Sequence, residues 1–389
     1  PKSCCLAYEQ SRQAANTLND AEDTILKVNA AILYETGQPL VVETIDLAEP
    51  ASGEVLIRMV AAGVCYSDYH IINGEWQHPL PAVLGHEGAG IVERIGPDVT
   101  RVSPGQGVIL NFRANCGVCH YCVIGRPVLC NGIATPRNTM FDGTSRLSKN
   151  GSILHHFSRT ACFAEYAVVP ESGAVPVSDE MPLDKACLAG CAVMTGIGAV
   201  VNTAQLSAGA TVMVLGCGGV GLNIIQGAAL RGARKIIAVD MLDNKLEYAK
   251  LFGATNCINS SKIDATKEVV EISGGGVDYA FEAVGNVSTV RQAYDMLGPG
   301  GTLVMVGMAP EQKEFSINAL SLPRGEKTIT GSWYGGARPW VDLPLLTKLY
   351  LDGKIQIDPL ISRSYPLDRI NDAFRALVAG EVARSIISF

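Results

Sequence analysis

Apolar residues in the second half of the chain recur in short runs separated by stretches of helical periodicity. The runs that predict buried strands are residues 212–215, 255–258, 277–281, 301–306 and 328–331. The stretches that predict helices are residues 245–252, 266–273 and 287–297. Strands that alternate with helices favour a parallel sheet with both faces covered, so this half predicts a doubly wound α/β domain.

The first half has a different pattern, which predicts a second kind of domain. Residues 25–175 contain short segments rich in Val, Ile and Gly, separated by Pro and Gly turns, and this is typical of irregular β structure. We place the boundary near Ala192 and expect the chain to leave the α/β domain near Gly336, so that the last fifty residues rejoin the first domain. The predicted domains are 25–192 together with 337–389, and 193–336.

Composition and charge limit the classes of molecule that the chain is expected to bind. The chain carries 31 Lys and Arg against 38 Asp and Glu, a formal charge of −7, and no basic block, so nucleic acid and anionic membranes are poor partners. The most apolar stretch, residues 186–201, is shorter than the ~20 residues of a membrane span. Residues 1–24 lack the apolar run of a secretory signal, so we expect a loosely ordered leader on a cytoplasmic protein.

Four of the twelve cysteines lie in one short segment and predict a structural metal site. Their spacing is C-x-x-C-x-x-C-x(7)-C, formed by Cys116, Cys119, Cys122 and Cys130. Four thiolates complete a tetrahedral zinc shell and leave no position for a substrate. Two disulfides are the alternative in an oxidising compartment, and an iron–sulfur cluster is the alternative among metals. We expect a small zinc lobe at about residues 113–131.

A second set of ligand types is dispersed along the chain. Cys65 lies in GVCYSDYH, His86 in LGHEGAG and Cys191 in AGCAVMTG. Two thiolates and one imidazole leave the fourth position of a tetrahedral zinc open, and this set is the established alcohol dehydrogenase example of a catalytic zinc site. Taken singly, each residue has a plainer interpretation as a small buried side chain or a hydrogen-bonded core histidine.

The segment TVMVLGCGGVGLNIIQGAALRGARKIIAVD predicts a dinucleotide site. An apolar strand runs into Gly216, Gly218 and Gly221, a helix follows, and a second strand ends at Asp240, nineteen residues after Gly221. The glycines allow a tight turn and bring the helix N-terminus close to a pyrophosphate, while the acid accepts from ribose hydroxyls. The alternative is a strand–helix–strand unit in which the glycines serve only the turn.

In order and spacing, the motifs GHEGAGIVERIG, the four-cysteine loop, GCAVMTG, LGCGGVG and RSIISF resemble the medium-chain zinc-dependent alcohol dehydrogenases. The resemblance covers about Lys27 to Phe389. It implies a GroES-like β domain plus a Rossmann domain, two zinc ions per chain and NAD. The stretch PRNTMFDGTSRL resembles the longer loop of the class I and class III enzymes, which implies a homodimer.

The resemblance also implies roles for further residues. Ser67 and His70 would carry the substrate proton, Asp68 would orient His86, and Glu87 would lie behind the zinc. The implied cofactor residues are Gly216, Gly218, Gly219, Val220, Gly221, Asp240, Lys245 and Arg384. Many relatives have Arg or His where this chain has Tyr66, so we expect one fewer contact to the pyrophosphate and a more weakly held cofactor.

The implied substrate pocket is lined by Trp76, Phe112, Phe157, Met308 and Trp333. Four aromatic rings and a thioether without a charged group predict a hydrophobic alcohol or aldehyde as substrate. The nearer alternative is a formaldehyde dehydrogenase acting on the glutathione adduct, although the loop NGIATP lacks the arginine those enzymes use. The farther alternative is a noncatalytic NAD-sensing or structural relative, against which the complete zinc ligand set argues.

Overall fold

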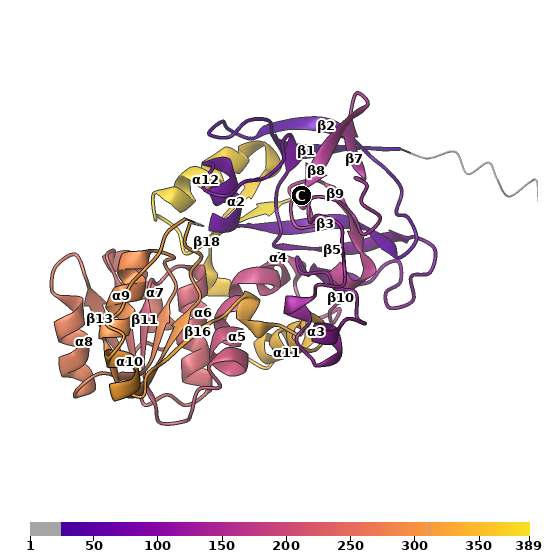
Figure 1. The fold of residues 1–389 in the computed structure, drawn as a ribbon. Coiled ribbons are helices and arrows are strands. Elements are labelled where there is room, and N and C mark those ends of the chain that lie inside the picture. Colours follow the sequence, from indigo (N-terminus) through magenta and orange to yellow (C-terminus); the bar gives the residue numbers. More distant parts are fainter. Residues whose placement is uncertain (1–24, 311) are drawn as a thin grey trace, which may run out of the picture.

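The computed structural model describes residues 25–310 and 312–389, which form two parts connected by a long helix (Figure 1). One part is a parallel sheet with helices on its faces, and the other is built from two mainly antiparallel β layers, each with one parallel strand pair. A group of buried apolar side chains crosses from one part to the other and includes Ile109 of the β part, Ile197 of the long helix and Leu222 of the α/β part. The two parts therefore share a core where they meet.

The parallel sheet has six strands in the order β13-β12-β11-β14-β15-β16. Their bounds are β11 (Thr211–Leu215), β12 (Lys235–Asp240), β13 (Asn256–Asn259), β14 (Val277–Glu282), β15 (Leu297–Met305) and β16 (Thr328–Gly331). Every residue of β11 is buried, as expected for a central strand covered on both faces. The strand order reverses direction between β11 and β14, and dinucleotides bind at such a switch point in Rossmann folds. The predicted α/β domain is confirmed.

Helices follow the strands of this sheet much as the apolar periodicity indicates. They are α6 (Gly219–Leu230), α7 (Asp243–Leu251), α8 (Ala265–Ser273), α9 (Val287–Asp295) and α10 (Ser321–Arg324). The Asp264 side chain caps α8 by accepting from the Lys267 amide at 3.2 Å, and Gly274 ends it at a φ of 79°. The prediction for α9 runs two residues too far, because Leu297 already belongs to β15.

The other part combines a closed barrel with a mixed sheet. The barrel consists of β1 (Leu26–Leu33), β2 (Val41–Leu47), β7 (Leu147–Lys149), β8 (Ser152–His156) and β4 (Ala82–Val83). The sheet runs β10 (Ala174–Pro176), β6 (Gly107–Leu110), β5 (Gly88–Ile95), β3 (Glu54–Val64), β18 (Arg384–Ser388) and β17 (Ile361–Pro366), and β9 (Tyr166–Pro170) also pairs with β3. These layers form the GroES-like domain that the sequence predicts.

The carboxyl-terminal segment returns to this β part. Strand β18 pairs antiparallel with β3, so that Ser385 lies opposite Val64, and α12 (Ile370–Val378) lies beside it in Figure 1. The remaining helices are α2 (Tyr66–Ile72), α3 (His120–Val123) and α11 (Pro339–Leu351), with single turns at Pro127–Leu129, Glu171–Gly173, Tyr334–Gly336, Asp358–Leu360 and Leu367–Arg369.

The long connecting helix, Leu183–Thr203, differs from the sequence interpretation in length. It has 21 residues and a mean hydropathy of 1.6, so it is long and apolar enough to span a membrane, whereas the apolar stretch 186–201 had indicated a shorter element. Its burial explains its composition, because 78% of the apolar window lies inside the fold. A Cβ atom on Gly196 would lie 2.4 Å from the Asn223 Cβ, so this helix packs directly on α6. The predicted boundary near Ala192 falls within it.

Candidate active site and zinc centres

The four clustered cysteines converge at one point of a small lobe formed by α3 and the turn Pro127–Leu129. Their Sγ atoms lie 3.5 to 4.0 Å apart in the pairs Cys116–Cys122, Cys119–Cys122, Cys119–Cys130 and Cys116–Cys130. Tetrahedral Zn–S bonds of ~2.3 Å place sulfurs ~3.8 Å apart, whereas a disulfide needs ~2.05 Å. The arrangement suits a single ion, since a multi-iron cluster would hold the sulfurs farther apart.

The dispersed ligand set also converges. The metal-binding atoms of Cys65, His86 and Cys191 all lie within 4.8 Å of one another, and all three residues are buried. Cys65 lies between the end of β3 and the start of α2, His86 lies between β4 and β5, and Cys191 lies in the long helix. There, residues Ala189–Val193 form a π turn, a helix irregularity that is frequent at functional sites. Three ligands from three elements leave a tetrahedral ion one open position.

Asp68 orients the histidine of this set. The Nδ1 atom of His86 donates to the Asp68 carboxylate at 3.2 to 3.3 Å, which leaves Nε2 to face the two thiols. Asp68 is fully buried and also accepts from the Gly85 amide at 2.9 Å. Burial raises the pKa of Asp68, and the charge of His86 opposes that rise. A hydrogen bond from Cys191 holds the pKa of the Cys65 thiol well below its ordinary value.

Glu87 connects the zinc site to the carboxyl-terminal strand. Its Oε1 accepts from the Ala192 amide at 2.8 Å, and its Oε2 forms an ion pair with Arg384. Both charged groups are buried. The aliphatic part of Arg384 lies against Gly219, where an added Cβ would approach the Arg384 Cδ to 2.4 Å. Arg384 therefore lies between the zinc ligands and the glycine-rich loop.

Helix α2 presents the predicted proton-carrying residues next to the zinc ligands. Ser67 and His70 are three positions apart, so their side chains emerge on the same face of the helix. The His70 ring stacks on Trp76 at a centroid distance of 4.6 Å, and its Nδ1 pairs with the Glu75 carboxylate. Tyr66 is 46% exposed and lies 6.2 Å from the His70 ring.

The glycine-rich loop has the geometry of a pyrophosphate site. Gly216 has a φ of 95°, and a Cβ on Gly221 would lie 1.7 Å from the Gly216 carbonyl oxygen, so only glycine fits this close turn. No side chain caps α6, which leaves its first amides to bind an anion. Asp240 ends β12 and accepts from the Cys217 amide at 2.8 Å. Lys245 donates to the Val382 carbonyl and is buried, which lowers its pKa.

The predicted pocket residues fall into two groups. Phe112 and Phe157 each meet the His86 ring edge to face at 5.3 Å, and Trp76 stacks on His70 as described above. Met308 and Trp333 instead line a cavity of about 930 Å³ between the cysteine lobe and the ends of β15 and β16. No ring contact joins Trp333 to the zinc ligands within the described residues.

Sequence reasoning missed two features of this pocket. Tyr334, which follows Trp333, is buried and contacts the Phe112 ring at 4.2 Å, so it is the aromatic residue nearest the inner pocket from this segment. Arg113 and Arg137 lie over the Trp333 ring at 4.1 and 4.8 Å. The cavity that Met308 and Trp333 line contains Arg126 and Arg338, so it is not free of charge, and the assignment of the substrate pocket stays a prediction. An arginine directly after Phe112 was the available signal.

Comparison with known proteins agrees with this architecture. Residues 219–349 match the family described as zinc-binding dehydrogenase, and residues 51–179 match the alcohol dehydrogenase GroES-like domain. Fold and ligand sets thus define a zinc-binding oxidoreductase of two domains. The chain belongs to the medium-chain zinc-dependent alcohol dehydrogenase family.

Several solved structures are similar over nearly the whole chain. An alcohol dehydrogenase zinc-binding domain protein from Burkholderia ambifaria has 35% identity and a TM-score of 0.90, covering 94% of this chain and 100% of that one. Benzyl alcohol dehydrogenase from Acinetobacter calcoaceticus has 33% identity and a TM-score of 0.89, with coverage of 94% and 99%. A Sinorhizobium meliloti 1021 protein solved with NADP has 27% identity and a TM-score of 0.79, with coverage of 94% and 100%.

The two cysteine clusters predict the metal content of the purified protein. We expect two zinc ions per chain, because each cluster has the donor atoms and spacing for one ion. Elemental analysis of protein purified without added metal measures this number. One zinc per chain, or a stoichiometric iron signal, would contradict the assignment of the two sites.

Proposed function

We propose that this chain catalyses reversible hydride transfer between NAD and a primary or secondary alcohol with an apolar body. The observation that carries the proposal is the buried set of Cys65, His86 and Cys191 with one open position, next to a nucleotide-binding loop. A coupled absorbance assay with NAD and a panel of alcohols tests it. No turnover with any alcohol, aldehyde or cofactor in the fully metallated protein would refute it.

The residues around the three proposed zinc ligands have separate roles in the reaction. A zinc ion held there would supply a Lewis acid that lowers the pKa of the substrate hydroxyl, and NAD would accept the hydride. Ser67 would take the hydroxyl proton first, and His70 would pass it towards solvent. Glu75 and Trp76 hold the His70 ring in one orientation. Asp68 keeps Nε2 of His86 directed at the metal.

The glutathione-adduct formaldehyde dehydrogenase is the second candidate. The stretch NGIATP lacks the arginine on which that activity depends in the family, which disfavours it. Arg137, later in the same loop, is a cation beside the Trp333 ring, and this observation favours testing the candidate. Formaldehyde oxidation with and without glutathione decides between the two, because only the adduct enzyme needs glutathione.

Asp240 leads us to expect a preference for NAD over NADP. Its carboxylate can accept from both ribose hydroxyls but would face the 2′-phosphate of NADP as a like charge, so we expect kcat/KM for NAD to be at least about tenfold higher. Asp240→Ser should relax this preference. Equal kcat/KM values for the two cofactors in the unsubstituted protein would overturn the role of Asp240.

The inner pocket predicts how activity changes along a substrate series. Phe112, Phe157 and Trp76 offer apolar surface, and each buried methylene contributes up to ~0.8 kcal/mol, or roughly fourfold. We therefore expect kcat/KM to rise from ethanol to longer or aromatic alcohols until the pocket is full. If ethanol or a polyol is the best substrate by tenfold, the aromatic residues block the channel instead of lining it.

Our proposal also covers the assembly and the cellular setting. The long loop after Cys130 supports a homodimer of the class I and class III type, which light scattering of the purified chain measures directly. A net charge of −7 without a basic block supports a cytoplasmic enzyme that binds neither nucleic acid nor a membrane surface.

A further inference from the structure

The turn at residues 157–162, which follows β8, has a strained backbone close to a proposed zinc ligand. Ser158, Arg159 and Ala161 have φ angles of 55°, 59° and 48°, in the left-handed region that residues other than glycine seldom adopt. Such conformations persist only where the surrounding structure holds them, and they cluster at functional sites. The turn must therefore be fixed by contacts with its neighbours.

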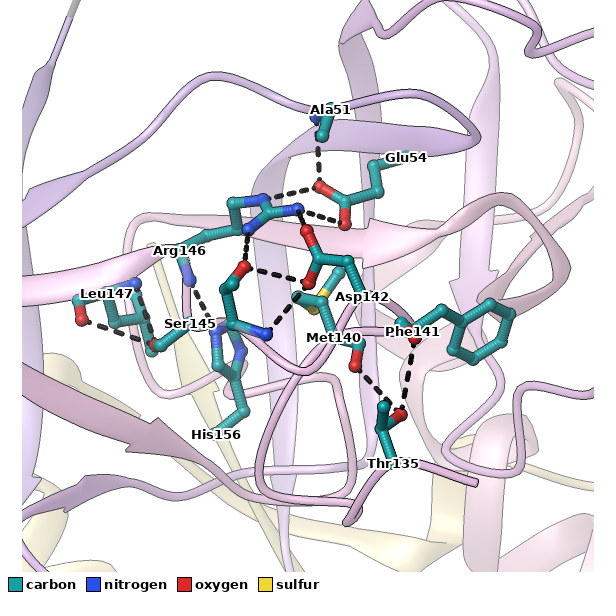
Figure 2. A network of polar contacts seen from close by, with 11 residues as sticks. Ala51, Glu54, Thr135, Met140, Phe141, Asp142, Ser145, Arg146, Leu147 and His156 are labelled. Atoms are coloured by element: carbon teal, nitrogen blue, oxygen red, sulfur yellow. Dashed lines mark hydrogen bonds and ion pairs between the residues drawn. The ribbon is translucent and has the colours of Figure 1, made fainter. Parts of the chain in front are cut away.

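The side of the turn that leaves β8 is held by the polar network in Figure 2. His156, the last residue of β8, is buried, and its Nε2 accepts from the Arg146 amide at 3.1 Å. The Arg146 side chain forms a two-point ion pair with Glu54 of β3, with both distances at 2.8 Å. Burial lowers the pKa of His156 to about 3, so the ring stays neutral and Nε2 remains an acceptor. The end of β8 is thus connected through Arg146 to β3.

Within the turn, Arg159 is held by a neighbouring loop. Its side chain is buried, and its Nη2 donates to the carbonyl oxygens of Thr135 and Pro136 at 2.6 and 3.0 Å. Its backbone amide donates to the Arg137 carbonyl at 3.1 Å. These three acceptors keep Arg159 in its left-handed conformation. Because the turn is anchored on both sides, it gives firm support to the residue at its centre, Thr160.

Thr160 contacts the peptide that leads into the zinc ligand His86. Its side chain is buried, and its hydroxyl donates to the Gly85 carbonyl oxygen at 2.9 Å and lies 2.8 Å from the Phe157 carbonyl oxygen. The Cys162 amide also donates to the Gly85 carbonyl, at 3.1 Å. Because the peptide unit is planar, the direction of the Gly85 carbonyl determines the direction of the His86 amide. The turn thus fixes the backbone from which the His86 side chain projects.

Gly85 is held from its other side by Asp68. Its amide donates to the Asp68 carboxylate at 2.9 Å, and the same carboxylate accepts from Nδ1 of His86. Gly85 has a φ of 91°, and a Cβ there would lie 2.6 Å from the Phe163 amide nitrogen, so the position has little freedom to move. Phe157, which begins the turn, meets the His86 ring at 5.3 Å. Both the backbone and the ring of His86 are therefore constrained by Asp68 and by the turn.

We propose that Thr160 is a positioning residue for the open zinc site, the site formed by Cys65, His86 and Cys191. Its hydroxyl fixes the peptide between Gly85 and His86, and this peptide sets the position from which Nε2 of His86 reaches the metal. This role rests on the proposed function, which needs a zinc ion at that site. Loss of a partner that orients a zinc ligand typically lowers metal affinity by roughly 10- to 100-fold. Because Thr160 contacts the backbone of the ligand and not its ring, we expect the lower value.

Thr160→Val tests the role directly, because it removes the hydroxyl and keeps the shape of the side chain. We expect zinc to leave the open zinc site about tenfold faster in an excess of the chelator 4-(2-pyridylazo)resorcinol, while release from the cysteine lobe is unchanged. Cys191→Ser, which lacks the open zinc site, identifies the lobe phase of the release curve. Thr160→Ser restores the hydroxyl and should return the rate to within about twofold of that of the unsubstituted protein.

Thr347→Val is the matched control. Thr347 is buried in α11, and its hydroxyl donates to the Pro344 carbonyl at 2.9 Å, so the substitution breaks a contact within one helix. Both zinc ions should leave this variant at rates within about twofold of those of the unsubstituted protein. Thr160→Ala removes the same hydroxyl by a different change of shape and should match Thr160→Val, so the test remains if the valine variant does not fold.

The release curves also define the results that would overturn the proposal. Release from the open zinc site that is no faster in Thr160→Val than in Thr347→Val overturns it. Equal acceleration at both zinc sites also overturns it, because that result reports a general loss of stability. If both phases are present but no alcohol is oxidised, the proposed function fails, and the release rates still decide the role of Thr160. A curve with the lobe phase alone contradicts the proposed function and the role of Thr160 together.

Discussion

Replacing Cys191 with serine is expected to lower kcat for alcohol oxidation by about 10³-fold or more while the lobe metal remains bound. A serine hydroxyl is a much weaker zinc ligand than a thiolate, so the substitution removes an ion that supplies several kcal/mol of charge stabilisation in the transition state. Steady-state kinetics and elemental analysis on the same sample measure both effects, and zinc content should fall from two ions to about one.

The long helix offers a matched control for this substitution. Cys187 is also fully buried, lies one turn before Cys191 and is outside both clusters, with its thiol directed at the Asp184 carbonyl at 3.3 Å. Cys187→Ser should keep both zinc ions and activity within about twofold, with a small loss of thermal stability. Retention of full activity in Cys191→Ser would show that the buried triad is not the catalytic metal site.

Replacing Cys119 with serine is expected to act on folding. A structural zinc contributes directly to the free energy of folding, so losing one of its four ligands should lower Tm by about 10 °C or leave the protein insoluble. Differential scanning calorimetry measures the change. In residual soluble protein, the catalytic zinc should still be present, because its ligands come from other elements.

Val118 provides the control within the same lobe. Its side chain is 80% exposed and is not a metal ligand, so Val118→Ser should leave zinc content unchanged and Tm within about 1 °C. A Tm for Cys119→Ser equal to that of Val118→Ser would contradict a structural role for the lobe metal.

The parts of the fold that the sequence predicted well are those governed by local pattern. Strand β11 and the loop Gly216–Gly221 are continuous in the chain, and their apolar run and close glycines permit few other conformations. The four-cysteine lobe is equally local. The triad of Cys65, His86 and Cys191 joins residues far apart in the chain, so spacing alone could not bring it together, and the family resemblance was needed.

The remaining features depend on long-range packing and left no local signal. The contact of Arg137 with Trp333 joins positions almost two hundred residues apart, and nothing near either residue indicates the other. The ion pair of Glu87 with Arg384 is similar, because it forms only when β18 pairs with β3. The helix Leu183–Thr203 is longer than the apolar stretch 186–201, because its first and last residues are only partly buried and hydropathy does not mark them.

The π turn at Ala189–Val193 determines the direction in which the Cys191 side chain leaves the helix. Each residue of an α-helix advances the side-chain direction by about 100°, and a π turn accommodates one residue more than an α turn. Deleting Ala192 would therefore do more than shorten the helix by one residue. Because the π turn holds the one extra residue, its loss would restore an α turn, and the helix beyond it would keep its packing on α6. The extra residue thus sets the direction in which Cys191 faces Cys65 and His86.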